Sequence, residues 1–181
     1  MVPLDFLTVM ALSFILVIAA TLFMWLWSIF NSFTTLRNEA FERFSQFKAT
    51  QEKKLDMTEQ LLGVVKDHMA TDKEVLDQIS AIRNKTAMGG PAEMGPADKE
   101  SKALAGKLIS IAMSDPAMRS SSMISNIEGS IKDLDSEIVG QKNAYNDMAG
   151  RYNTLLETSP SSIIGELMGM RKLGPIDEET S

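Results

Sequence analysis

The N-terminal part of the chain is a long run of apolar residues. No charged side chain lies between Phe6 and Leu36, and residues 6–30 contain only scattered Thr and Ser among the apolar residues. A helix needs roughly 20 such residues to cross a bilayer. We therefore predict a membrane-spanning helix over residues 6–30, preceded by a short segment, 1–5. A cleaved signal peptide would carry basic residues ahead of a shorter apolar run, and none precede this one.

Aromatic residues and charges predict how this span is placed in a membrane. Four aromatic side chains gather at its C-terminal end, where such rings settle at the level of the lipid headgroups. The predicted membrane interface consists of Trp25, Trp27, Phe30 and Phe33. All 18 Lys and Arg residues follow the span, and basic residues are retained on the cytoplasmic side. We therefore predict an external N-terminus and a cytoplasmic C-terminal domain.

A heptad pattern follows the span and predicts a long helix. Apolar residues recur in alternating steps of three and four from Phe41 onward, which is the spacing of a coiled-coil seam. One glycine and no proline interrupt the stretch before residue 89. These features predict one helix over residues 31–88. The Gly and Pro residues that come next predict a loop over residues 88–97, because proline lacks an amide proton and glycine favours turns.

Two further helices complete a predicted antiparallel bundle over residues 31–158. The apolar spacing predicts helices over residues 98–114 and 116–157. Asp115 is a suitable N-cap for the second of these, and Pro116 suits its first position, where the missing donor would have had no partner. The chain is therefore predicted to be all-α, with coiled-coil-like packing.

The helix predicted over residues 116–157 carries the clearest repeat in the chain. Such a seam forms either an internal core or a surface on which another chain associates. Its two tyrosines, each followed by an asparagine, are expected to form a core layer in preference to a recognition ladder for another helix. The residues of this core or association seam, together with two aromatic residues of the first helix, are Phe41, Phe44, Ile124, Ile127, Ile131, Leu134, Ile138, Tyr145 and Tyr152.

The tail, residues 159–181, is apolar and then acidic. An exposed tail is normally polar, so the apolar part is expected to dock on its own bundle, on a neighbouring molecule or on the bilayer surface. The side chains expected to dock are Ile163, Ile164, Leu167 and Met168.

The chemistry of the side chains points away from enzymes and from nucleic-acid binding. There is no cysteine and His68 is the only histidine, so the usual zinc sets cannot form. Adaptable core packing explains the 13 methionines better than a copper site does. Asp133, Asp135 and Glu137 are expected on a solvated outer face. The net charge of −6 and the lack of a basic stripe exclude nucleic acid as a partner. We predict no catalytic, cofactor or metal site.

These residues resemble the LemA family of bacterial membrane proteins over almost the whole chain. The matching pieces, in order, are Leu36-Arg37-Asn38, Leu61-Leu62-Gly63-Val64-Val65-Lys66, Ala103-Leu104 through Asp115-Pro116, Tyr145-Asn146, Tyr152-Asn153 and Ser159-Pro160. The chain lacks the family's proline in the first helix and has Ile176 where the family has an aromatic residue. The resemblance implies a divergent member, an anchored antiparallel helical bundle in the bacterial inner membrane, and no established catalytic activity.

Two functions fit these expectations. The helix over residues 98–114 is too short to cover the long first helix evenly, so apolar surface should remain for partners. The main hypothesis is a membrane-anchored scaffold that self-associates laterally as a homo-oligomer, because confinement to one membrane concentrates the chains. The alternative is a tethered adaptor that presents a helix or the tail to another membrane or envelope-stress protein.

Orientation is directly testable. Because every basic residue follows the span, a phosphatase that works only in the periplasm should be inactive when fused after Ser181. A fluorescent protein that matures in the cytoplasm should be bright at the same position. An active phosphatase fusion would contradict the predicted orientation.

Overall fold

The computed structural model describes residues 6–66 and 72–177. Within these residues the chain is all-α, as predicted, and no strand is present. The helices are α1 (Phe6–Val65), α2 (Asp72–Met88), α3 (Pro91–Ser114), α4 (Pro116–Arg119), α5 (Ser122–Glu157) and α6 (Ser161–Leu167).

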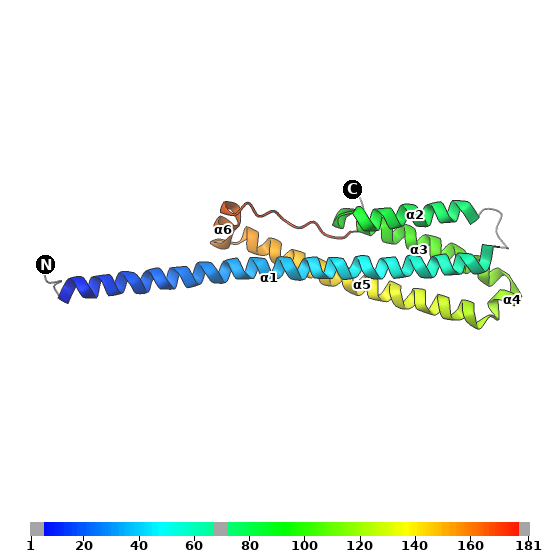
Figure 1. Ribbon diagram of the computed structural model, residues 1–181, viewed down its shortest axis with the longest axis horizontal. Helices are drawn as coiled ribbons and strands as arrows, with labels where there is room; N and C mark the ends of the chain where they lie inside the picture. Colours follow the sequence, from blue (N-terminus) through cyan, green and yellow to red (C-terminus); the bar gives the residue numbers. More distant parts are fainter. Residues whose placement is uncertain (1–5, 67–71, 178–181) are drawn as a thin grey trace.

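The two ends of α1 have different surroundings. Its N-terminal part extends alone beyond the rest of the molecule, whereas its C-terminal part runs along the other helices (Figure 1). The most apolar 18-residue window of α1 has a mean hydropathy of 2.6, and none of it is buried by the protein. Among the described residues, α1 is the one helix long and apolar enough to cross a membrane, and it is compatible with a single-pass membrane protein.

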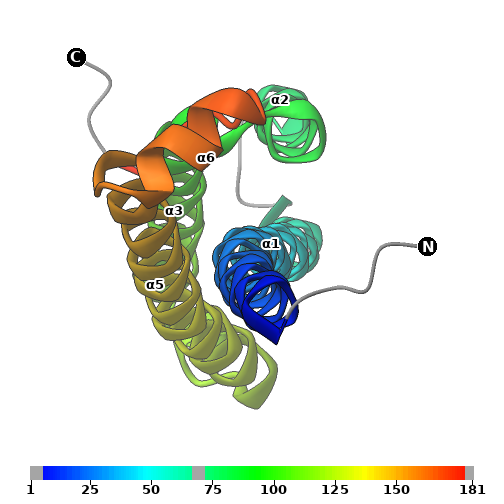
Figure 2. The ribbon, with the colours of Figure 1, turned by 90° about the vertical axis from the view of Figure 1, so that its left-hand side faces the viewer.

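The bundle forms by successive reversals of the chain. Helix α2 runs back beside α1, α3 runs outward again, and α5 returns antiparallel to α1 as its main partner (Figure 1). Viewed from the N-terminal end, α2, α3 and α5 form an arc around one side of α1 (Figure 2). The short α4 makes the turn between α3 and α5, and Asp115 caps it by accepting a hydrogen bond from the amide of Ala117 at 2.8 Å.

The predicted single helix over residues 31–88 is wrong in the structure. Helix α1 ends at Val65, and α2 folds back against it; the expected continuation through His68 and Met69 lies outside the described residues. Arg83 of α2 binds three carboxylates of α1, with distances of 3.0, 3.0 and 3.2 Å to Glu52, Asp56 and Glu59. A heptad pattern cannot distinguish a continuing helix from a returning one, because both present the same apolar spacing.

The predicted loop over residues 88–97 is also mostly wrong, because α3 already begins at Pro91. Proline is favoured in a first turn, where its missing donor has no partner. The connection from α2 is tight because Gly89 has no side chain. A Cβ atom at Gly89 would lie 2.4 Å from the carbonyl oxygen of Lys85 and 2.8 Å from Cε of Met94.

Two apolar clusters form the core. The distal core, far from the apolar end of α1, contains residues from α1, α2, α3 and α5. The proximal core, nearer that end, also includes a residue of the C-terminal tail. The buried members of the distal core are Leu55, Leu61, Leu62, Val65, Val75, Ile79, Ile82, Ala97, Leu104, Ala105, Leu108, Ala112, Ile124, Ile127 and Ile131. Those of the proximal core are Ala40, Phe47, Met94, Ile138, Tyr145, Ala149 and Ile176.

A polar layer separates the two cores. The side chain of Lys54 is fully buried, and its Nζ lies 3.0 Å from Oδ1 of Asp98 on α3 and 2.6 Å from Oδ1 of Asp135 on α5. Thr50 donates a hydrogen bond to Oε1 of Glu137 at 3.0 Å. The expectation of a solvated outer face is therefore wrong for Asp135, which is partly covered and binds the buried cation of α1. Glu137 is exposed, as expected, and it also accepts a hydrogen bond from the buried hydroxyl of Thr50.

The buried ion pair predicts a large difference between two neighbouring lysines. Lys54→Ala leaves Asp98 and Asp135 without their cation, so the free energy of unfolding should fall by about 3–5 kcal/mol. Lys53 is exposed, so Lys53→Ala should change it by less than about 0.5 kcal/mol. The stability of both variants is measured by thermal unfolding of the full chain in detergent, monitored by circular dichroism. Equal effects would contradict the polar layer.

Candidate membrane-proximal site

The C-terminal tail forms an extended strap, residues 170–177, that lies along the bundle. After α6 the chain turns at Gly169, whose φ of 64° is a left-handed conformation that glycine adopts without strain. The strap then runs back from α6 toward the start of α3 (Figure 1). At its far end the side chain of Ile176 is buried in the proximal core. This part of the tail docks on its own bundle.

Two asparagines of α5 hold the strap by its backbone. Asn146 accepts a hydrogen bond from the amide of Ile176 at 2.8 Å and donates one to its carbonyl oxygen at 3.1 Å. Asn153 does the same with Leu173, at 2.9 and 2.8 Å. The asparagines are two helical turns apart, a rise of about 10.5 Å. Three residues of extended chain span about 10 Å, so the spacings on α5 and on the strap match.

The tyrosines that precede these asparagines pack inward. Tyr152 meets the ring of Phe33 edge-on, with centroids 5.8 Å apart. Tyr145 packs 5.6 Å from Phe44 and donates a hydrogen bond to the carbonyl oxygen of Gly174 at 2.7 Å. Burial raises the pKa of Tyr145 to about 12. Each Tyr-Asn pair therefore has one residue that packs on α1 and one that binds the strap.

Helix α6 sits close to the bundle through one glycine. A Cβ atom at Gly165 would lie 2.5 Å from Cδ2 of Leu156 and 3.4 Å from Cζ of Phe33, so a larger residue would require Leu156 or α6 to shift. On the other side of the helix, Ile163 and Leu167 are 58% and 83% exposed. The expected docking of the tail is therefore divided, because the strap packs on its own bundle while these two side chains stay mostly exposed.

The predicted membrane-interface residues differ in their exposure. Trp25, Trp27 and Phe30 are exposed on α1, as a lipid-facing position requires. Phe33 is fully buried. Phe33 therefore does not face lipid, because Tyr152 of α5 and the close approach of α6 cover its ring.

Most of the predicted seam lies inside the bundle. Ile124, Ile127 and Ile131 belong to the distal core, and Ile138 and Tyr145 belong to the proximal core. The other seam residues are the buried Tyr152, the half-buried Phe44 and Leu134, and Phe41, which is 49% exposed.

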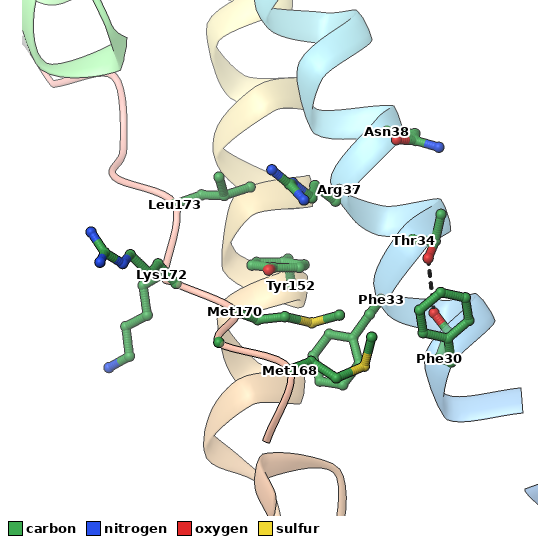
Figure 3. Close-up of a pocket in the computed structure, with 12 residues that line it drawn as sticks. Phe30, Phe33, Thr34, Arg37, Asn38, Tyr152, Met168, Met170, Lys172 and Leu173 are labelled. Atoms are coloured by element: carbon green, nitrogen blue, oxygen red, sulfur yellow. Dashed lines mark hydrogen bonds between the residues drawn. The ribbon is translucent and has the colours of Figure 1, made fainter. Parts of the chain in front are cut away.

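A hollow of about 490 Å³ opens between α1 and the start of the strap. Figure 3 shows Phe33, Tyr152, Met168 and Met170 gathered at its apolar side, so Met168 faces this hollow. Arg37 lies at its rim, where its guanidinium carbon is 5.5 Å from the ring centroid of Phe41. The lining can hold an apolar group beside a positive charge, and it contains no acidic side chain.

The sequence pattern revealed the Tyr-Asn pairs but not what they bind. Asparagine clamps act on backbone groups, which leave no trace in the identity of the strap residues. The buried Ile176 was visible only as an apolar residue within a polar terminus. In the part of the chain that the structure describes, no group of three or more His, Asp or Glu residues is placed to hold a metal ion.

Together these features define a class of protein, an antiparallel helical bundle built on a single apolar helix and completed by a C-terminal strap. A sequence model of the LemA family matches residues 43–177, which include most of the bundle and the strap. The chain belongs to the LemA family. A search of curated proteins found no match.

The clamps predict unequal effects for three asparagines of α5. Asn146→Ala and Asn153→Ala each leave a backbone donor and acceptor of the strap unpaired, which should lower the free energy of unfolding by roughly 1–3 kcal/mol. Asn143 is exposed on the same helix, so Asn143→Ala is the matched control and should have little effect. Melting curves and proteolysis of the C-terminus report the change. A strap as resistant to protease in Asn153→Ala as in the unmodified chain would rule out the clamp.

Proposed function

We propose that the chain is a non-catalytic scaffold of the bacterial inner membrane, with its N-terminus outside and its bundle in the cytoplasm, and that copies of it associate laterally. Membership of the LemA family supports this assignment. So does the single apolar helix, because within the described residues no second helix of the chain covers its apolar part. Such a helix is free to contact lipid or another copy.

Exposed apolar side chains near the membrane carry the proposal. The stripe that sequence reasoning left uncovered on the first helix is covered in the structure, because α2 adds to α3 and α5 around α1. Phe41 remains 49% exposed on α1, three turns beyond Phe30. A large apolar ring at this position can pack against a second chain whose span lies in the same bilayer, where the local concentration of copies is high.

The buried polar groups support a structural role. Lys54 is neutralised by carboxylates from two other helices, and Tyr145 is used to hold the strap. These contacts connect elements of the bundle to one another. Among the residues that the structure describes, they do not pair a nucleophile with a base.

A tethered adaptor is the second candidate. The exposed Ile163 and Leu167 of α6 favour it, because they could be presented to a different membrane protein. In that case the apolar contact would form with one partner of fixed mass.

Photo-crosslinking in native membranes separates the two candidates. With a photoreactive residue at position 41, the scaffold should give a ladder at multiples of its own mass. Position 123 is the control, because Met123 is 57% exposed but lies on the distal part of α5; it should give no ladder. A single heavier product that is no multiple of the chain mass would support the adaptor. The absence of any product at position 41 would count against the scaffold; a photoreactive residue at position 167 of α6 tests the adaptor in the same way, and no product there would count against it.

A further inference from the structure

From its position beside the end of the apolar run, we infer that α6 lies in the interfacial region of the bilayer and that Ile163 and Leu167 contact lipid. The bundle would then touch the membrane at two places, through α1 and through α6. This inference requires that α1 spans the membrane, and it does not require that copies of the chain associate.

The first argument is the height of α6 along α1. The α5–α6 turn, residues 158–161, lies beside the end of the apolar run. Together with Trp25, Ser28, Ile29 and Ser32 of α1 it lines a shallow hollow of about 260 Å³. Farther along, the approach of Gly165 to Phe33 sets α6 next to the following turn of α1. Helix α6 is therefore level with the last turns of the apolar run. Figure 1 shows it at the point where α1 leaves the bundle.

Bilayer dimensions place that level at the headgroups. The helical rise from Phe6 to Phe30 is about 36 Å, and the hydrocarbon core is about 30 Å thick. A span centred in the core therefore has Trp25 and Phe30 at the hydrocarbon boundary and Phe33 just outside it. Helices that lie in the plane of a membrane bury an apolar face about 5–10 Å into this same zone.

The second argument is the chemistry of α6. Ile163 and Leu167 are four residues apart, so they share one face of the helix. This face points away from the bundle, since Gly165 makes the close contact with it. Met168, directly after α6, is also exposed. The remaining large apolar side chains exposed beyond the span are dispersed over three other helices; they are Phe41, Leu76, Met88, Met123 and Val139.

Charge near α6 suits a membrane that contains anionic lipid. Arg171 and Lys172 follow directly after the turn and are exposed, and Arg37 lies across the hollow on α1. Glu157 pairs with Lys172 at 2.5 Å, and Glu166 is a nearby acidic side chain. Basic residues beside an apolar face favour binding to anionic surfaces.

The strap makes this contact favourable by holding α6 in place. Asn146 and Asn153 fix the strap to α5, so α6 reaches the membrane already ordered. Preorganisation of this kind lowers the entropic cost of binding. Lipid is also the one apolar partner that always surrounds α1.

Depth-dependent quenching tests the inference on the full chain. The chain has no cysteine, so Leu167→Cys and Ile163→Cys can each carry one environment-sensitive fluorophore. Met123→Cys is the matched control, because Met123 is 57% exposed and Ile163 58%. The proteins are reconstituted in phosphatidylcholine–phosphatidylglycerol vesicles at high dilution, with nitroxide on the lipid as one quencher and iodide in the buffer as the other.

Labels at 163 and 167 should be strongly quenched by a nitroxide near the headgroup, weakly by one near the end of the acyl chain, and little by iodide. The label at 123 should respond only to iodide. If the labels at 163 and 167 behave like the label at 123, α6 faces water and the inference fails. If they are shielded from both quenchers, a protein covers α6 and the inference also fails. High dilution keeps the result separate from self-association, which the crosslinking ladder tests.

Discussion

The arrangement of the bundle depends on the ion pairs that the buried ammonium of Lys54 forms with two carboxylates. Removing a charge from water costs several kcal/mol unless it is paired, and here Asp98 and Asp135 supply the partners from two other helices. Helices that meet only through apolar heptads can slide by one repeat and still bury the same kind of side chain. With this layer in place, a slipped register of α1, α3 or α5 would leave a buried charge unpaired.

That register determines which residues lie beside the apolar part of α1. With Asp135 opposite Lys54, the antiparallel α5 brings Tyr152 to Phe33 and ends beside the last turns of the apolar run. The strap must then return along α5 to reach the proximal core with Ile176. The position of α6 is thus set by an ion pair in the middle of the bundle and by two asparagine clamps, whereas its own seven residues make few contacts.

Local signals in the sequence predicted the apolar run, the helical class, the Asp115 cap and the core positions of α5, because each depends on neighbouring residues. The reversal between α1 and α2 was missed, because a returning helix has the same apolar period as a continuing one. The roles of Asp135 and Glu137 were missed because their partners lie on α1, far away in the sequence. The clamps escaped notice since an asparagine that binds backbone needs no particular partner residue.

The Tyr-Asn pairs show how one helix can serve two neighbours. Successive residues of a helix point about 100° apart, so a tyrosine directed at α1 is followed by an asparagine directed at the strap. Helix α5 therefore connects α1 to the strap at two levels. At the level of Tyr145 the strap adds Ile176 to the proximal core, which also contains Phe47 and Met94. A displacement of α6 would act on the proximal core through this connection. The distal core lies beyond the Lys54 layer and shares no residue with the strap, so α2 and the outer part of α3 can remain packed when the strap is released.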